Sequence, residues 1–399
     1  MHPEAKLAIH GGRPVRDRLL PYGRQTITDA DVAAVVDVLR SDWLTTGPRV
    51  GEFEEAFAGH VGARHAVSFS SGTAALHAAV FAAGLEDGDE AITAPLTFCA
   101  TSNAVLYQGA TPVFADITGD TLTIDPEAAA RAVTDRTRAL MPVDYAGHPA
   151  DLDAMRTLAD RHGLVIIEDT AHALGASYRG RPVGSISHLS VFSFHPVKHL
   201  TTAEGGMVTT EDAALANRLR LFRNHGIERD ARTRQAEGTW FYEMTALGFN
   251  YRLTDLACAL GLAQLPRLPA NVARRQAIAA RYHEALSGLP SLTLPATATD
   301  VAHAWHLYPV RVRPPVDREE VFRALRAEGL GVNVHYIPVH LHPYYRERFG
   351  YRGGEFPIAE AAYHQLISLP MFHGMSDEDV EDVTAAVTKV MAHFQRVTT

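Results

Sequence analysis

Lys198 is the residue whose type and surroundings point most directly to chemistry. Only three of the 37 basic residues are lysines, namely Lys6, Lys198 and Lys389. Lys198 ends the sequence Ser-Phe-His-Pro-Val-Lys (193–198), which follows an apolar strand. A lysine amine is a nucleophile only when it is unprotonated, a state that burial or a nearby cation promotes. We therefore predict that Lys198 condenses with a carbonyl group; the alternative is a lysine that extends from a surface loop.

Asp169 is the second candidate. It closes the apolar run 164–167, so it is expected at the carboxyl end of a strand, 29 residues before Lys198. A carboxylate in that position can hold the nitrogen of a pyridine ring in its protonated form, and the protonated ring stabilises carbanions. An aspartate after a strand can also be a simple helix cap or turn residue.

Ser71, Gly72 and Thr73 join the predicted strand 66–69 to a helix rich in alanine and leucine. Backbone N–H groups and hydroxyls converge at such a helix amino terminus and can bind a phosphate, although ordinary capping uses the same residue types. Ser193, five residues before Lys198, could add a hydroxyl. Phe98 follows another predicted strand and could stack on a flat ring, or be a core aromatic.

The elements that must position these residues alternate between strands and helices, which predicts an α/β fold. Short apolar runs are followed by segments of helical period, an arrangement typical of a large, mainly parallel sheet with helices on both faces. Ligands of such sheets bind beyond the carboxyl ends of the strands. The predicted strands are 66–69, 90–94, 111–115, 139–143, 164–168, 188–193 and 206–209.

We place a domain boundary where Pro266 and Pro269 interrupt the helical pattern. Residues 1–265 would then form an amino-terminal segment with the large domain, and residues 266–399 a smaller α+β domain. Its predicted elements are a long helix over 271–286, strands at 305–312 and 331–335, and helices at 318–328 and 377–394.

Composition limits the possible functions. The charge of -9 lacks the clustered basic face of nucleic-acid binders, and no apolar run reaches the roughly 18 residues of a membrane span. The first 18 residues lack the apolar core of a signal peptide, and the chain has two cysteines, Cys99 and Cys258. We therefore expect a soluble, cytoplasmic protein that binds neither nucleic acid nor membranes.

Five motifs in the right order resemble the DegT/StrS sugar aminotransferase family of fold-type I pyridoxal-phosphate (PLP) enzymes. They are Ser-Ser-Gly-Thr (70–73), Glu-Asp-Thr-Ala-His (168–172), Ser-Phe-His-Pro-Val-Lys-His (193–199), Glu-Gly-Gly (204–206) and Asn-Tyr-Arg (250–252). The resemblance covers nearly the whole chain. It implies that Lys198 forms the Schiff base with PLP and that Asp169 pairs with the pyridine nitrogen.

The resemblance also implies the remaining cofactor contacts. Ser71, Gly72, Thr73 and Ser193 would surround the phosphate, and Phe98 would stack on the ring. His172 stands where many relatives have glutamine, facing the phenolic oxygen or the ring. Asn250 matches an asparagine that reaches the phosphate from the neighbouring subunit, which implies a homodimer with shared sites.

Further segments resemble the branch of the family that aminates a UDP-linked 4-keto sugar on the route to pseudaminic acid. These segments are residues 20–25, 41–48, 240–244 and 335–345, and within them Thr45, Thr46, Tyr336 and His340 are expected to contact the sugar nucleotide. Asp144-Tyr145 departs from the His-Phe pair associated with that branch, so the sugar and the nucleotide stay open. We expect no metal at His335, His340 and His342: the last two would share one face of an extended segment, but no acidic or thiol residue is near in sequence. A substrate-binding wall near the sugar diphosphate is the expected role of these histidines.

The expected reaction moves an amino group from glutamate to C4 of a nucleotide-linked 4-keto-6-deoxy sugar, with Lys198 carrying the proton. The alternatives are a 3-keto sugar nucleotide or an aminocyclitol as acceptor, or the aromatising dehydration that makes aminohydroxybenzoate. Family dehydratases have histidine in place of Lys198, which argues against the last. A non-catalytic, PLP-binding regulator is the alternative from another class.

Overall fold

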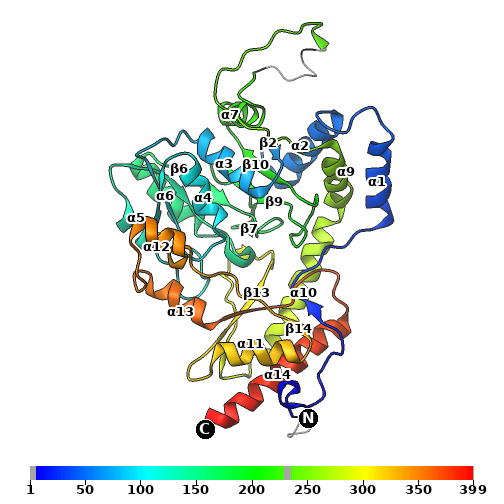
Figure 1. The fold of residues 1–399 in the computed structure, drawn as a ribbon, viewed down its shortest axis with the longest axis vertical. Helices are drawn as coiled ribbons and strands as arrows, with labels where there is room; N and C mark the ends of the chain where they lie inside the picture. The colour runs from blue at the N-terminus through cyan, green and yellow to red at the C-terminus, as the bar shows by residue number, and fades with distance from the viewer. Residues whose placement is uncertain (1–5, 229–233, 235, 399) are drawn as a thin grey trace.

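A seven-stranded sheet forms the centre of the computed structural model, which describes residues 6–228, 234 and 236–398 (Figure 1). The strands lie in the order β2-β10-β9-β6-β5-β3-β4, and only β10 runs antiparallel to its neighbours. This confirms the predicted α/β fold with a large, mainly parallel sheet. The bounds are β2 (His65–Phe69), β10 (Gly206–Thr210), β9 (Leu189–Ser193), β6 (Val165–Asp169), β5 (Thr137–Met141), β3 (Glu90–Thr93) and β4 (Thr111–Phe114).

Helices cover both faces of this sheet because alternate residues of its strands point to opposite sides. Met141 of β5 packs with α3 (Gly72–Ala82), α4 (Ala100–Tyr107) and α7 (Ala213–Arg223). The preceding residue, Leu140, packs with α5 (Pro126–Ala132) and α6 (Leu152–His162) on the other side. The strands are therefore buried on both faces, as their nearly continuous apolar sequences require.

The proline-rich break occurs where it was predicted, but it is short. Helix α9 (Asp255–Gln264) leads into the 3-10 turn η3 (Leu265–Arg267), and α10 (Leu268–Leu286) follows at once. Helix α10 begins three residues earlier than expected, because Pro269 stands in its first turn, where its missing N–H costs no hydrogen bond.

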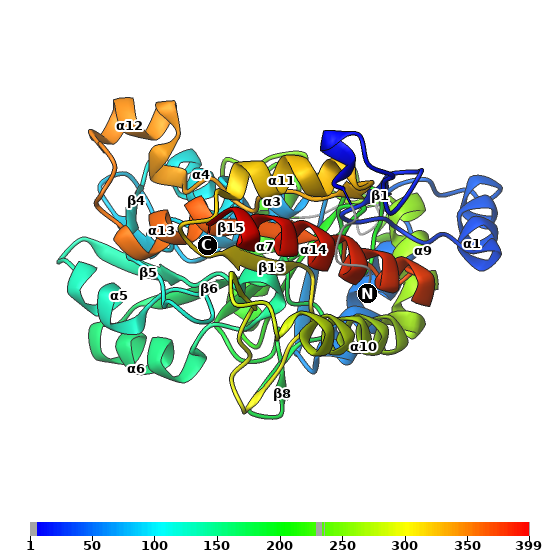
Figure 2. The same cartoon turned by 90° about the horizontal axis from the view of Figure 1, so that it is seen from below.

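The carboxyl-terminal part is built on a three-stranded antiparallel sheet, β11 (Leu292–Thr293), β13 (Tyr308–Val312) and β15 (Leu366–Leu369). Figure 2 shows α14 (Asp377–Thr398) between α10 and α11 (Arg318–Ala327), in contact with both. The strand predicted at 331–335 is only the two-residue β14 (Leu330–Gly331).

The amino-terminal segment packs against this carboxyl-terminal part. Strand β1 (Leu20–Pro21) pairs in parallel with β14, and Leu7 and Leu20 join a core cluster that includes Tyr308 and Val387. The predicted division at residue 265 groups this segment with the large domain, whereas residues 7–21 pack with the second core. The division itself stays a prediction.

None of the described helices is long and apolar enough to cross a bilayer.

Several described elements were not predicted. The unpredicted elements are β1, β11 and β15, with η1 (Ala8–His10), α1 (Asp29–Leu39), α2 (Pro48–Val61), η2 (Tyr145–Gly147), β7 (Ser177–Tyr178), β8 (Arg181–Pro182), β12 (Val301–Ala302), η4 (Val339–Leu341), α12 (Pro343–Phe349) and α13 (Pro357–Gln365).

Candidate active site

A cavity of about 380 Å³ lies beyond the carboxyl ends of β2, β6 and β9 and the amino terminus of α3. This is the edge at which parallel sheets bind ligands. Its wall contains most of the predicted cofactor residues, namely Ser71, Gly72, Thr73, Phe98, Asp169, His172, Ser193 and Lys198, together with Tyr336. The structure therefore brings together residues from five separate segments of the chain.

Lys198 follows β9 on a turn, where its backbone N–H donates to the carbonyl of His195 (2.9 Å). Its Nζ atom lies 3.4 Å from Nε2 of His306. Burial, with a contribution from the Arg275 cation, lowers the pKa of Lys198 to about 7, although the Asp169 carboxylate favours the charged form. A substantial fraction of this amine is therefore neutral near pH 7 and can act as a nucleophile or base.

Asp169 is the last residue of β6, and its carboxylate is almost fully buried. Oδ2 accepts a hydrogen bond from Oγ1 of Thr101 (2.7 Å), and Oδ1 accepts one from the N–H of Ala171 (3.1 Å). Burial raises the pKa of Asp169, whereas these two donors and the Lys198 amine lower it. Sequence reasoning missed Thr101, because its contact with Asp169 spans 68 residues.

The amino terminus of α3 forms a cup. Ser71 is its N-cap, and its Oγ accepts a hydrogen bond from the N–H of Ala74 (3.1 Å). A Cβ atom at Gly72 would lie 2.9 Å from Cβ of Ser193, so glycine lets β9 approach the helix closely. The N–H groups of the first turn and the hydroxyls of Thr73 and Ser193 are what a phosphate group requires.

Aromatic and imidazole rings form another part of the cavity wall. Phe98 is 55% exposed, unusual for a phenylalanine that lines a cavity, and its ring centroid is 5.8 Å from that of Tyr336. His172 Nδ1 accepts a hydrogen bond from the N–H of Ala146 (3.3 Å), and its Nε2 lies 3.0 Å from the Tyr336 hydroxyl. Burial lowers the pKa of His172 well below its ordinary value, so the ring is neutral.

A model of the DegT/DnrJ/EryC1/StrS aminotransferase family matches residues 25–388. The chain belongs to this family. The spore coat polysaccharide biosynthesis protein SpsC of Bacillus subtilis is 45% identical over 381 residues, covering 94% of this chain and 98% of SpsC.

Two solved structures of family members resemble this aminotransferase closely. Helicobacter pylori PseC, involved in pseudoaminic acid biosynthesis, is 33% identical with a TM-score of 0.88, and the match covers 95% of this chain and 100% of PseC. DesI, solved in the presence of its TDP-sugar product, is 34% identical with a TM-score of 0.88, over 99% of this chain and 98% of DesI. The protein is a PLP-dependent sugar aminotransferase with the type I fold.

The residues of the cavity fit PLP. The neutral amine of Lys198 suits its aldehyde, the buried carboxylate of Asp169 suits a protonated pyridine, and the α3 cup suits its phosphate. The wall also contains His335, which was predicted to belong to a substrate-binding wall, and Tyr22 and His306, which were not predicted to contact the cofactor or sugar. Tyr22 and His335 lie within segments that carried the branch resemblance, whereas nothing in the sequence singled out His306.

His340, predicted to contact the sugar, does not lie at this cavity. It is 0% exposed, its Nε2 is 3.0 Å from Oε1 of Glu360, and its ring packs 4.7 Å from that of Phe356. A side chain without exposed surface cannot line a substrate pocket, so we correct this interpretation. His340 sits in the 3-10 turn η4, which directs the ring into an aromatic cluster instead of along an extended edge.

His340, Glu355 and Glu360 have potential ligand atoms within 4.8 Å of one another, a neighbourhood that the sequence concealed. Both glutamates, however, already accept hydrogen bonds from backbone N–H groups, Glu355 from Arg352 and Gly353, and Glu360 from Gly354. The two glutamates therefore stabilise the loop 352–356 by accepting its backbone N–H groups, which explains why they lie close together.

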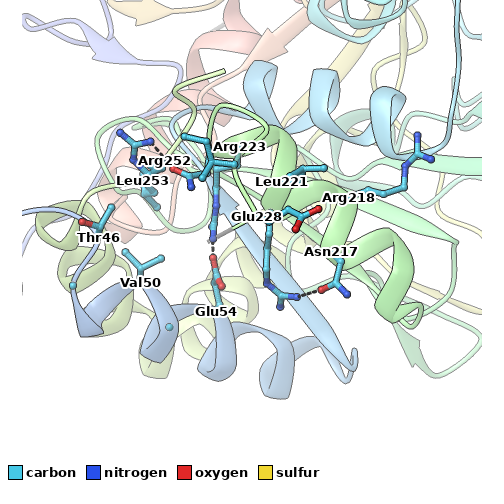
Figure 3. A pocket seen from close by; sticks show the side chains of 15 residues that line it. Thr46, Val50, Glu54, Asn217, Arg218, Leu221, Arg223, Glu228, Arg252 and Leu253 are labelled. Atoms are coloured by element: carbon cyan, nitrogen blue, oxygen red, sulfur yellow. Dashed lines mark hydrogen bonds and ion pairs between the residues drawn. The ribbon is translucent and has the colours of Figure 1, made fainter. Parts of the chain in front are cut away.

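Thr45, Thr46 and Asn250 lie apart from the cavity of their own chain. Thr46 lines a second hollow of about 630 Å³ between α2 and α7, shown in Figure 3. Asn250 forms a β-bridge with Asn224 of that hollow, and Thr45 forms one with Thr254. Arg252 donates to the side chain of Asn224 (2.8 Å), and Arg223 pairs with Glu54. The hollow is rich in arginine, with Arg218, Arg220, Arg223 and Arg252 in its wall.

Proposed function

We propose that this aminotransferase transfers an amino group from L-glutamate to C4 of a nucleotide-linked 4-keto-6-deoxy sugar. The observation that carries the proposal is the juxtaposition of a buried Lys198 amine, neutral in a substantial fraction near pH 7, with Asp169 and the α3 cup in one cavity. The similarity to PseC and to DesI, which was solved with a TDP-sugar product, supports a sugar nucleotide as acceptor.

Each wall residue then has a role in our proposal. When bound, PLP supplies an electron sink for the carbon that loses its proton. Lys198 removes the proton from the amino donor and returns one to the sugar carbon, which requires an amine that titrates near neutral pH. Asp169, whose ionised form is stabilised by hydrogen bonds from Thr101 and Ala171, holds the pyridine nitrogen protonated. Ser71, Gly72, Thr73 and Ser193 bind the phosphate, and Phe98 and His172 bind the ring.

We assign Thr45, Thr46 and Asn250 to the active site of a second copy of the chain. All three lie around the arginine-rich hollow, away from the cavity that contains Lys198. Arginine side chains recognise phosphate groups through paired N–H donors, so this surface suits both the cofactor phosphate and a sugar diphosphate. Tyr336, on the cavity wall of its own chain, is assigned to the sugar.

The pair Asp144-Tyr145, which departs from the branch pattern, lies behind the wall. Both residues are buried, and the Tyr145 hydroxyl donates to the carbonyl oxygen of His335. Burial and the neighbouring Glu168 carboxyl raise the pKa of Asp144 well above its ordinary value. The departure therefore acts through the position of His335 and not through a contact with the sugar.

A two-stage experiment tests the proposed function. The PLP form is converted with glutamate to the pyridoxamine form, which is then mixed separately with 4-keto and 3-keto sugar nucleotides and with a cyclic ketone that models an aminocyclitol precursor. Return of the aldehyde absorbance with the 4-keto compounds alone supports the proposal. Return with only a 3-keto compound or the cyclic ketone replaces it by the corresponding acceptor, and no conversion with glutamate removes glutamate as donor.

A further inference from the structure

Arg275 of α10 is a cation enclosed by the protein. It is 0% exposed, and its Nη1 donates to the carbonyl oxygens of Trp305 (3.1 Å), His306 (3.3 Å) and Met371 (3.0 Å). Its Nε and Nη2 atoms have no hydrogen-bond partner among the described residues, and no carboxylate there forms an ion pair with it. A buried, uncompensated cation is unfavourable for folding, so its presence calls for another explanation.

The three carbonyls show what Arg275 organises. Trp305 has a φ of 50°, a left-handed conformation that is unfavourable for a bulky residue. The ring of Trp305 stacks on that of His303 with centroids 3.8 Å apart, and the Arg275 contacts join this turn to the turn at Met371. The three hydrogen bonds from Arg275 therefore hold a strained turn in place just before β13.

The turn delivers His306 to the active site. Nε2 of His306 lies 3.4 Å from Nζ of Lys198, and its ring centroid is 4.3 Å from that of His172. Nδ1 of His306 is buried without a hydrogen-bond partner among the described residues, so the ring is held by its contacts with His172 and His199 and by the backbone that carries it. Its orientation depends on the backbone that Arg275 holds.

We propose that Arg275 is a positioning residue of the active site, which acts through the 305–306 turn and His306 to hold the amine of Lys198 in place. The proposal rests on the assignment of Lys198 as the reacting amine. His306 touches the amine directly, whereas Arg275 reaches it only through the turn. A lysine at position 275 could keep the charge, but its Nζ atom ends one bond short of the position of Nη1 and so could not reach the three carbonyls in the same way.

Besides positioning the amine of Lys198, Arg275 favours the neutral form of that amine through its positive charge. The neighbouring histidines have pKa values lowered by burial, so Asp169 and Arg275 are the charges that act on the amine, with opposite effects. Loss of Arg275 removes the one that favours the neutral amine. The titratable groups that face Lys198 or line its cavity are Tyr22, Asp169, His172, His195, His199, Glu204, Arg275, His306, His335 and Tyr336.

The scarcity of lysine makes a direct test possible. The full-length protein is labelled with ¹³C-lysine, which gives three side-chain signals, and Lys198→Ala identifies the one of interest. The signal of Lys198 is titrated in the cofactor-free wild type and in Arg275→Met, Arg275→Lys and His306→Gln. Lys6 and Lys389 serve as internal references. Arg274→Met is the matched control, because Arg274 is the neighbouring residue of α10 and binds the exposed Asp377.

We expect Arg275→Met to move the Lys198 titration to higher pH and Arg275→Lys to leave it closer to wild type. In the PLP-loaded enzyme, Arg275→Lys should lower kcat at least about tenfold with KM within about twofold, because misplacement acts on the chemical step. The double variant Arg275→Lys/His306→Gln should have a kcat no lower than that of the worse single variant. The reason is that both changes disrupt the same contact, that of His306 with Lys198.

Other results would overturn the proposal. A wild-type titration in a folded Arg275→Met protein would show that Arg275 does not act on the Lys198 amine. Losses of kcat that multiply in the double variant would show that Arg275 does not act through His306. If Arg275→Met fails to fold, a kcat of Arg275→Lys within about twofold of wild type overturns the proposal equally. Failure of the proposed function is a separate result, seen as turnover by Lys198→Ala, and it leaves the titrations interpretable.

Discussion

Oδ2 of Asp169 and Oγ1 of Thr101 lie 2.7 Å apart, which joins the end of β6 to the first turn of α4. Burial alone would favour the protonated form of Asp169, so the ionised carboxylate that PLP requires depends on this donor and on the N–H of Ala171. The electronic effect attributed to one residue is thus shared with a threonine 68 positions away.

Thr101→Val should raise the pKa of Asp169 further, because a hydrogen bond to the charged form is lost. A hydrogen bond to a charged group is worth about 1.5–3 kcal/mol, so we expect kcat to fall roughly ten- to hundredfold. The acid limb of the pH–kcat profile should move to higher pH. Thr101→Ser keeps the hydroxyl and should stay near wild type; an unshifted acid limb in the valine variant would contradict the role of Thr101.

Lys198→Met should abolish turnover and the absorbance of the cofactor Schiff base, and it should stabilise the cofactor-free protein. The folded-state pKa of Lys198, about 7, lies below the unfolded value of about 10.4, so the lysine costs stability most fully below pH 7 and not at all above pH 10.4. The gain in Tm should therefore be larger at pH 6.5 than at pH 9.5. Equal gains at both pH values would mean that the amine titrates normally.

Gly72→Ala should weaken PLP binding about tenfold or more. The added Cβ would lie 2.9 Å from Cβ of Ser193, which forces β9 away from the α3 cup. The dissociation constant of PLP, measured by fluorescence titration, tests this expectation. Gly59→Ala is the control, because its added Cβ meets no atom within 4 Å, and unchanged affinity in both variants would place the phosphate elsewhere.

Mixing Lys198→Ala with Asn250→Ala proteins should restore activity if two chains share each site. In a mixed dimer, one site combines an intact Lys198 with an intact Asn250 from the other chain. Random pairing at equal amounts then gives about a quarter of the wild-type activity, because half of the dimers carry one intact site of two. Activity that stays at the sum of the separate variants would show that Asn250 serves its own chain or no site.

His340→Ala should destabilise the protein without affecting the sugar half-reaction selectively. The change leaves a cavity near Phe356 and removes a partner of Glu360, which together cost about 2–4 kcal/mol. Urea unfolding measures the loss, and stopped-flow absorbance measures both half-reactions. A selective loss in the sugar half-reaction would restore the interpretation of His340 as a sugar contact.

The sequence predicted the central sheet well because its strands are buried on both faces and therefore appear as continuous apolar runs. The cavity could be predicted because the recognised strands locate their own carboxyl ends, where ligands bind. Residues such as Asp169 and Ser71 lie at or just beyond those ends. Short elements such as β1 and β14 could not, because a two-residue strand has no pattern and exists only through its partner.

Residues that act through distant contacts were also beyond prediction. Arg275 is one arginine among many in the sequence, and only its complete burial distinguishes it. His340 was assigned to the sugar because its segment carries the branch resemblance, whereas the chain turns at η4 and buries the ring. Local pattern indicates what a segment prefers, but the packing around it decides where a side chain points.

The pairing of β1 with β14 makes residues near the amino terminus part of the fold that carries the active site. Tyr22 follows β1 directly, lines the cavity, and its carbonyl accepts a hydrogen bond from the N–H of Met371 (2.9 Å). The family match starts only at residue 25, so a shortened protein that keeps the recognisable region would lose a strand and part of the cavity wall. A truncation that removes residues 20–22 should therefore be treated as a change to the active site.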